Sequence, residues 1–189
     1  MKNLWISVRI TLAMCVVLTV GYVLLLRLTS AVVSPNDGEA ALVELDGKVV
    51  GAANVGQAFT DSVYFWGRPS AVEYNGGGSG GSNKGTNNPE YLAQVEERID
   101  AFLAAHPYLS REEVPAEMVT ASGSGLDPDI SPRGAQAQVR RVAEARGLDI
   151  ATVRHLVDSL TQKPWLGLFG TEKVNVLRLN VALEELNEN

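Results

Sequence analysis

Hydrophobic positions are continuous at the start of the chain and periodic in the rest of it. Residues 10–26 form an uninterrupted stretch of 17 uncharged, mostly apolar residues between Arg9 and Arg27. A helix crosses the hydrocarbon core of a bilayer with about 17–25 apolar residues, so this stretch is long enough to span it. We therefore expect residues 1–30 to be a transmembrane anchor that contacts membrane lipid. A cleaved signal peptide is the alternative, although its apolar region is usually only about 7–15 residues long.

The basic residues around this stretch predict its orientation. Lys2, Arg9 and the amino terminus lie on one side of it, and only Arg27 lies on the other. Positive charge is retained on the cytoplasmic side of a membrane helix. The sequence therefore predicts a cytoplasmic N-terminus and an extracytoplasmic domain formed by residues 31–189.

Turn residues between short apolar runs predict strands in this domain. Asp46-Gly47 separates two such runs, and this dipeptide supplies the positive φ angles of a tight hairpin turn. We expect a β-hairpin over residues 41–50 and further short strands at residues 63–66, 117–120 and 174–177.

Four helices are predicted from apolar residues at helical spacing and from capping residues. They begin after Asn88, Ser131 and Asp149, and a closing helix covers residues 179–186. Each of these three side chains can accept a hydrogen bond from the first turn of a helix. Strands and helices that do not alternate regularly indicate an α+β fold, here a single mixed domain after one membrane helix.

Charge and residue counts exclude several classes of protein. The three basic residues of the anchor leave the domain with 13 basic and 22 acidic residues, a net charge of −9, which argues against nucleic acid as a partner. The single cysteine, Cys15, lies in the apolar stretch, so a disulfide framework is excluded. Two histidines without a cysteine in the domain exclude a zinc site, and we expect no metal. His106 and His155 fall at the end and in the middle of predicted helices, where a solvated or packed role fits.

Residues 75–88 hold 6 of the 18 glycines and predict a long loop. The loop matches G-x-G-x-x-G and G-x-S-x-G patterns by composition. It lacks the strand-turn-helix context of a dinucleotide site or of a serine nucleophile. Two interpretations of the loop stay open. It is either a flexible or partner-facing loop, or an anion-binding site in which glycine N–H groups bind the anion together with Ser79, Ser82, Asn83 and Thr86.

Candidates for structural or interface roles are three further polar residues, Arg68, Asp127 and Arg141. Asp127 and Asp129 flank a proline, where carboxylates typically form a turn and cap the next helix. Calcium binding is the alternative, but no glutamate follows at the spacing of an EF-hand loop. Arg68 and Arg141 can each pair inside the domain or across an interface, and the same holds for Asp127. No set of residues has the spacing of acid, base and nucleophile, so we expect a noncatalytic chain without a covalently bound cofactor.

Three segments together resemble one family. They are residues 56–83, with G-Q-A-F, Y-F-W-G-R-P-S-A and S-G-G-S-N; residues 122–148, with S-G-S-G-L-D-P-D-I-S-P and A-R-G-L; and residues 166–180, with L-G, V-N-V-L and L-N. Over essentially the whole chain, these segments closely resemble the C subunit family (KdpC) of the bacterial Kdp potassium-transporting ATPase. The family usually has histidine where Asp129 stands and alanine where Gly134 stands, so a role that needs an imidazole at position 129 is not carried over.

The resemblance implies a four-part complex in the bacterial inner membrane. In it a channel-like subunit conducts potassium, a P-type ATPase subunit hydrolyses ATP through an aspartyl phosphate, and a small membrane peptide accompanies them. The C subunit is implied to be an accessory that stabilises the assembly and acts as a catalytic chaperone, raising the affinity of the ATPase subunit for ATP. The chain lacks an Asp-Lys-Thr-Gly-Thr phosphorylation motif, which agrees with a noncatalytic subunit.

Two hypotheses follow for the effect on ATP. Direct contact with nucleotide needs a cytoplasmic domain and would use Ser79, Gly80, Gly81, Ser82, Asn83 and Gln138. The predicted extracytoplasmic domain would instead cap the outer mouth of the channel-like subunit. Its effect on the affinity for ATP would then be transmitted through the membrane subunits as a coupling free energy between the two sites. A self-contained membrane-anchored binding domain or enzyme is an alternative of a different class. It would need a convergent set of reactive residues, and the sequence shows none at a recognisable spacing.

Overall fold

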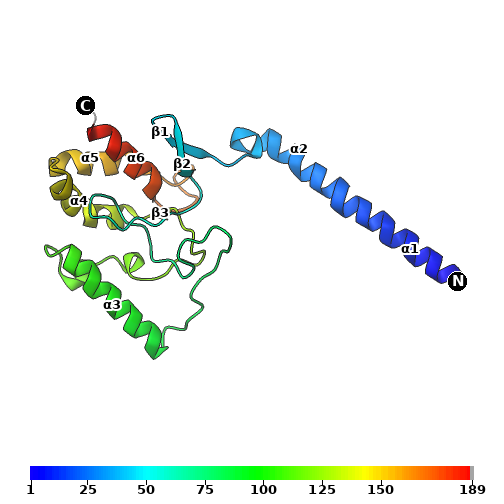
Figure 1. Cartoon of the computed structure of the whole chain (residues 1–189), viewed down its shortest axis with the longest axis horizontal. Helices are drawn as coiled ribbons and strands as arrows, with labels where there is room; N and C mark the ends of the chain where they lie inside the picture. Colours follow the sequence, from blue (N-terminus) through cyan, green and yellow to red (C-terminus); the bar gives the residue numbers. More distant parts are fainter. Residues whose placement is uncertain (188–189) are drawn as a thin grey trace. The chain divides into compact units, whose positions relative to one another are not determined.

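The computed structural model describes residues 1–187 and divides the chain into two compact units. The first unit is Met1–Ala41, and the second begins at Leu42. One long helix forms most of the first unit, whereas the second combines helices with short strands (Figure 1). The expected fold class, one N-terminal membrane helix followed by a mixed α+β domain, is confirmed.

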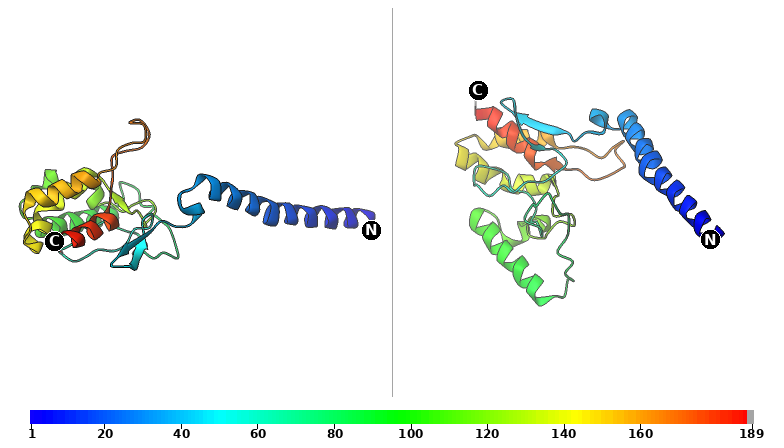
Figure 2. Two further views of the ribbon diagram at one scale, coloured as in Figure 1. Left: turned by 90° about the horizontal axis from the view of Figure 1, so that it is seen from above. Right: turned by 45° about the vertical axis from the view of Figure 1, so that its right-hand side comes forward.

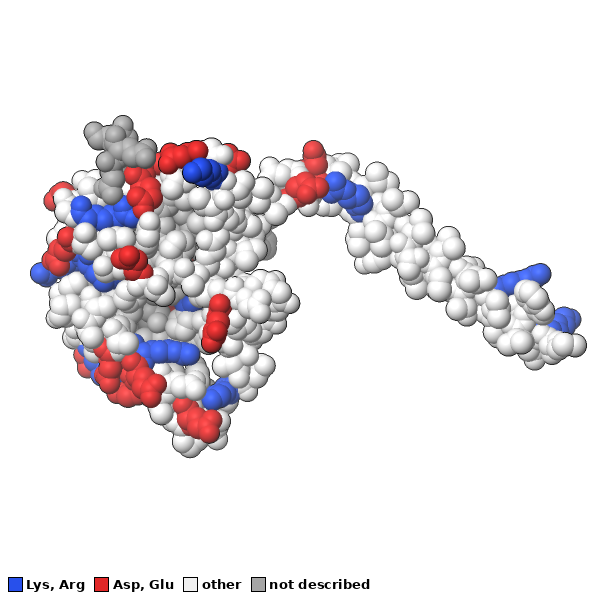
Figure 3. Space-filling view, viewed as in Figure 1, with Lys and Arg blue, Asp and Glu red and all other residues white. Residues whose placement is uncertain are grey.

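The helix of the first unit runs from Lys2 to Val33. It consists of α1 (Lys2–Cys15), a π-helical stretch (Val16–Tyr22) and α2 (Val23–Val33). Its most apolar window has a mean hydropathy of 2.2. Its 32 residues span about 48 Å at a rise of about 1.5 Å per residue, more than the roughly 30 Å of a hydrocarbon core. The middle of this helix is free of charged side chains, which lie toward its two ends (Figure 3).

A short 3₁₀ turn, Pro35–Gly38, follows the helix within the same unit. Arg27 donates to the backbone carbonyl of Asp37 at 3.1 Å and to the carboxylate of Glu39 at 3.2 Å. These two contacts connect the end of the helix to the turn that follows it.

The strands of the second unit form two separate antiparallel pairs. β1 (Leu42–Leu45) pairs with β2 (Lys48–Ala52), and β3 (Asp129–Ile130) pairs with β4 (Val174–Asn175). Asp46 and Gly47 connect the first pair with φ angles of 51° and 71°, the positive values that a tight turn requires. The predicted hairpin is therefore confirmed.

Four helices supply most of the remaining structure of the second unit. They are α3 (Pro89–Ala105), α4 (Pro132–Arg146), α5 (Ile150–Leu160) and α6 (Val176–Asn187). The predicted caps are present: Asn88 accepts from the N–H of Tyr91, Ser131 from that of Gly134 and Asp149 from that of Ala151. Local capping chemistry thus determines where these helices begin.

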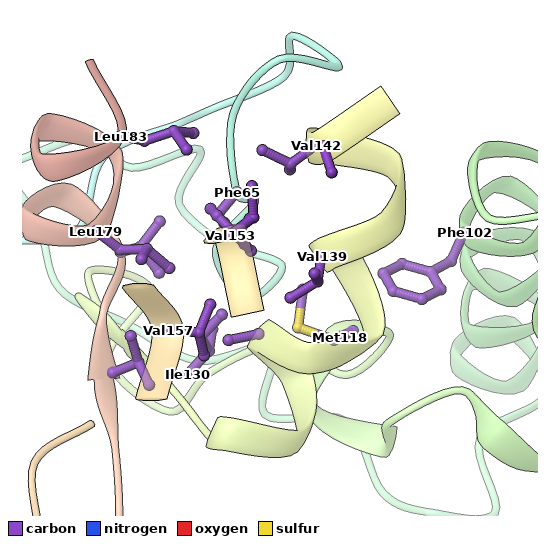
Figure 4. Packing of buried hydrophobic residues seen from close by; sticks show 14 of the residues in the cluster. Phe65, Phe102, Met118, Ile130, Val139, Val142, Val153, Val157, Leu179 and Leu183 are labelled. Carbon is purple, nitrogen blue, oxygen red and sulfur yellow. The ribbon is translucent and has the colours of Figure 1, made fainter. Parts of the chain in front are cut away.

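The hydrophobic core lies between α4, α5 and α6. Phe65, which belongs to no helix or strand, is fully buried and points into this cluster (Figure 4). Phe102 of α3 packs on the other side of α4, facing Val139 and Met118 (Figure 4). The helices contribute these buried side chains: Ala135, Val139, Val142 and Ala143 from α4, Val153 and Val157 from α5, and Leu179 and Leu183 from α6.

Two predicted strands are wrong and a third is shorter than expected. Residues 63–66 have no strand partner, and residues 116–118 form a 3₁₀ turn in place of a strand. β4 ends at Asn175, because the side chain of Asn175 accepts from the N–H of Arg178 at 3.0 Å and so caps α6 from its first turn. α6 therefore begins three residues before the predicted start.

Candidate functional site

The segment that was predicted as a strand at residues 63–66 is held by side-chain amides. Gln138 of α4 accepts from the N–H of Trp66 at 2.8 Å and donates to its carbonyl at 3.2 Å. Asn180 of α6 does the same for Phe65, at 2.8 and 3.0 Å. Both amides are almost completely buried. Two side chains thus satisfy the backbone groups that a neighbouring strand would otherwise satisfy.

Arg141 of α4 lies at the centre of this arrangement. Its guanidinium donates to the carbonyls of Ser62 and Tyr64 and, at 2.8 Å, to the side-chain oxygen of Gln138. It also lies over the ring of Trp66, 4.1 Å from the ring centroid. No carboxylate forms an ion pair with Arg141 in the described part of the chain, and burial lowers its pKa to about 10. Backbone carbonyls and a ring face replace the usual anionic partner.

His106, at the end of α3, accepts from Nε of Arg141 through its own Nε2 at 2.9 Å. Its Nδ1 lies 2.7 Å from the carbonyl of Phe102, so the neutral tautomer with the proton on Nδ1 satisfies both contacts. Burial, together with a smaller effect of the charge on Arg141, lowers the pKa of His106 to about 4, although the backbone hydrogen bond to Phe102 acts in the opposite direction. A solvated or packed role was expected for both histidines, and the structure shows His106 packed in the interior and His155 exposed on α5.

A second arginine, Arg146, connects the same segment to α6. Its Nε donates to the carbonyl of Val63 at 2.7 Å, and its two terminal nitrogens contact both oxygens of Glu184, at 3.1 and 2.7 Å. The Arg146 side chain is only 4% exposed. Its hydrogen bonds lower the pKa of Glu184. The sequence does not predict this pair, because nothing in the local pattern relates residues 38 positions apart.

Arg68 and Asp127 are brought together, 3.0 Å apart and each about a quarter exposed. Asp127 also accepts from the N–H of Asp129, which forms the predicted turn. The second carboxylate, Asp129, binds Lys173 at 2.6 Å and the side-chain amide of Asn175 at 3.3 Å. Asp129 thus stabilises the pairing of β3 with β4 by a charge pair beside it.

Gly134 of α4 lies close to a carboxylate. A Cβ added there would lie 2.4 Å from Oε1 of Glu117, and the same oxygen accepts from the backbone N–H and the hydroxyl of Ser131 at 2.9 and 2.6 Å. Glycine leaves room for this carboxylate beside the first turn of α4.

Arg68 contributes to the lining of two pockets. One, of 310 Å³, is lined by apolar side chains that include Phe59, Trp66 and Met118. The other, of 260 Å³, is polar and includes Asp127 and Lys173. The Nε atom of Arg68 is buried and makes no hydrogen bond to the described residues. Among residues 1–187, no group of three or more His, Cys, Asp or Glu is placed to hold a metal ion.

The glycine-rich loop packs against the segment around Ser124. The hydroxyl of Ser79 and the N–H of Gly80 both donate to the carbonyl of Ser124, each at 2.9 Å. A Cβ on Gly81 would lie 3.1 Å from the carbonyl oxygen of Gly123, so the two segments approach closely here.

The structure does not bring the six residues proposed for nucleotide contact into one site. Gln138 is fully buried, and its amide is engaged with Trp66, Gly134 and Arg141. Ser82 is partly buried, while Asn83 is exposed with a φ of 52°. Gln138 therefore presents no donor or acceptor to a ligand at the loop, and its observed role is to hold Trp66.

Comparison with known proteins identifies the family. A family model for KdpC, described as "K+-transporting ATPase, c chain", matches residues 4–185. The chain is 62% identical over 188 residues to a potassium-transporting ATPase KdpC subunit from Bacteroides fragilis strain YCH46, covering 98% of each chain. It is 54% identical over 186 residues to that of Flavobacterium psychrophilum, covering 98% of this chain and all of the relative. A KdpC subunit from Caldanaerobacter subterraneus is 42% identical over 179 residues, or 95% and 93% of the two chains. The chain therefore belongs to the KdpC family, the c chain of the potassium-transporting ATPase.

Proposed function

We propose that this chain is a noncatalytic accessory subunit of a potassium uptake complex in a bacterial inner membrane, where it raises the affinity of a P-type ATPase subunit for ATP. Its partners in this proposal are that ATPase subunit, a channel-like subunit, a small membrane peptide and membrane lipid. Membership of the KdpC family and one helix long and apolar enough to span a bilayer support its place in such an assembly.

One observation carries the noncatalytic part of the proposal: the most buried polar side chains hold the domain together. Gln138, Arg141 and Asn180 are at most 7% exposed, and their polar atoms bind the backbone of the segment around Phe65. A catalytic group has to reach substrate, and these side chains face the interior. These buried side chains therefore have a structural role, which agrees with a noncatalytic accessory subunit.

The basic residues of the anchor support a cytoplasmic N-terminus. Lys2 and Arg9 precede the apolar stretch, and only Arg27 follows it. In that orientation the second unit lies outside the cytoplasm, on the opposite side of the membrane from ATP. An effect on ATP affinity then has to be a coupling free energy that passes through the membrane subunits.

The glycine-rich loop fits this coupling mechanism better than direct nucleotide contact. An anion nest needs free backbone N–H groups, and the N–H of Gly80 already donates to Ser124. Gln138 is withdrawn into the core. The exposed part of the loop around Asn83 is left as a surface that can face a partner subunit.

The sidedness of the domain is tested with single cysteines, because Cys15 is the only cysteine of the chain. In a Cys15→Ala background, Thr86→Cys places a thiol in the exposed glycine-rich loop, and Asn3→Cys places one before the apolar stretch without removing a basic residue. A membrane-impermeant maleimide is expected to label position 86 in spheroplasts and position 3 only in inverted vesicles. Labelling of position 86 only in inverted vesicles would put the domain in the cytoplasm and contradict the coupling mechanism.

A further inference from the structure

Four large apolar side chains are exposed together at residues 164–170, which we call the apolar tip. Trp165 is 70% exposed, Leu166 76%, Leu168 77% and Phe169 57%. Exposed apolar residues scattered singly need no explanation, but a contiguous group of this size marks an interaction site. The tip contains no charged residue.

The apolar tip is the end of a hairpin that is closed by backbone hydrogen bonds. At its base Gln162 and Lys173 exchange two backbone hydrogen bonds, at 2.8 and 3.1 Å. Nearer the end, Trp165 and Phe169 exchange two more, at 2.9 and 3.0 Å, and their rings lie 5.6 Å apart. The tip projects from the helices of its unit (Figure 2, left). The four side chains are therefore held outward by a defined backbone, which lowers the entropy cost of binding.

The composition of the tip, and the short connection between its unit and the anchor, favour a lipid surface. Tryptophan is enriched at the membrane–water interface, and tryptophan, phenylalanine and leucine form the apolar face of segments that lie in it. Lys163, exposed at the edge of the tip, can extend its ammonium toward anionic headgroups. The eight residues 34–41 connect the membrane helix to β1, and even fully extended they reach only about 28 Å. The second unit consequently stays close to the bilayer that holds the anchor.

The small size of the tip is a second reason to expect a lipid surface in place of a protein partner. A stable protein interface buries about 800 Å² on each partner, which four side chains on a single hairpin do not supply. A contact with the bilayer needs less, because the anchor already provides most of the affinity and the second contact is intramolecular.

We infer that the apolar tip inserts Trp165, Leu166, Leu168 and Phe169 into the interfacial region of the same bilayer that holds the N-terminal helix. The chain then touches the membrane at two points, and the domain has a defined orientation over the lipid surface. This inference needs only the anchor, so it holds for a domain on either side of the membrane.

Spin-label accessibility tests the insertion on the full chain in lipid nanodiscs. A nitroxide is attached at Leu168→Cys in the Cys15→Ala background, and the matched control is Leu92→Cys, an exposed leucine of α3 at 52% exposure. The label at position 168 is expected to collide with oxygen severalfold more, relative to a water-soluble nickel chelate, than the label at position 92. A Leu166→Ser substitution in the labelled chain is expected to shift position 168 toward the chelate.

Two outcomes overturn the inference. In one, the labels at positions 168 and 92 are equally accessible to the nickel chelate in nanodiscs, which puts the tip in water. In the other, position 168 is accessible to the chelate in the isolated chain and becomes shielded from both reagents only in the assembled complex, which makes the partner a protein. Identical thermal unfolding of the labelled chains shows that each is folded.

Discussion

Asn180 of α6 forms hydrogen bonds with both backbone polar groups of Phe65, 115 residues earlier in the chain. The contact is fully inside the domain, since Phe65 is 0% and Asn180 2% exposed. It acts as a one-residue substitute for a β-strand partner and brings the middle of the chain against its last helix.

We expect Asn180→Ala to lower the free energy of unfolding by about 2–4 kcal/mol. The substitution leaves a buried N–H and a buried carbonyl unpaired, and each costs about 1–3 kcal/mol. Urea unfolding of the full chain in detergent micelles measures the effect. Asn54→Ala, at an exposed asparagine, is the control and is expected to change stability by less than about 0.5 kcal/mol. Equal stability of the two variants would show that the contact contributes nothing.

Gln138 and Asn180 are expected to act as one unit, because they hold adjacent residues, Trp66 and Phe65. When either amide is removed, the segment at Phe65 and Trp66 becomes less ordered, so the hydrogen bonds of the remaining amide contribute less to stability. A double-mutant cycle of Gln138→Ala and Asn180→Ala should therefore give a coupling energy of about 0.5–3 kcal/mol. Strict additivity would mean that the two amides act independently.

Arg141→Lys is expected to destabilise the domain by about 2–4 kcal/mol although it keeps the charge. A lysine ammonium cannot reproduce the planar fork that reaches Ser62, Tyr64 and Gln138 at once. The matched control is the neighbouring Arg140→Lys, where the arginine is exposed and pairs with Glu144. Chemical denaturation is expected to separate the two variants clearly. A mild effect at position 141 and an equal one at position 140 would refute the role assigned to the fork.

We expect the domain to become less stable as the pH decreases, because His106 is harder to protonate in the folded chain than in the unfolded chain. The pKa of this histidine is about 4 in the folded chain, below its ordinary value of 6.5. The unfolded chain therefore binds the extra proton first, and the free energy of unfolding decreases as pH falls from 6.5 toward 4, by at most about 1.4 kcal/mol per pH unit.

The pH effect is isolated by comparing two histidine substitutions. His106→Gln keeps an acceptor for Arg141 and should flatten the dependence over this window, whereas His155→Gln, at an exposed position, should leave it unchanged. Unfolding midpoints measured from pH 4 to pH 7 give the comparison. An unchanged slope in His106→Gln would assign the pH dependence to other groups.

Local chemistry explains what could be predicted from the sequence. The β-hairpin turn at Asp46-Gly47 and the helix starts after Asn88, Ser131 and Asp149 depend on residues within a few positions of one another, and all were predicted. The apolar, aromatic run at residues 63–66 has the composition of a strand. Its partners are side chains more than 70 positions away, so a local pattern could not show that a strand was absent.

The candidate site was predictable only in part, for the same reason. Arg68, Asp127 and Arg141 were singled out by residue type and position, but their partners follow from the tertiary fold. Gln138 was grouped with the glycine-rich loop, and the fold places it in the core. Arg146 and Glu184 were missed, since two charged residues on separate helices carry no signal of their pairing.

The most direct test of the central claim is the ATP dependence of hydrolysis by the purified complex, measured with and without this chain. The account predicts that removing the chain raises the KM for ATP several-fold, and that adding it back restores the lower value. A KM that does not change when the chain is removed would contradict the proposal that it raises the affinity of the ATPase subunit for ATP.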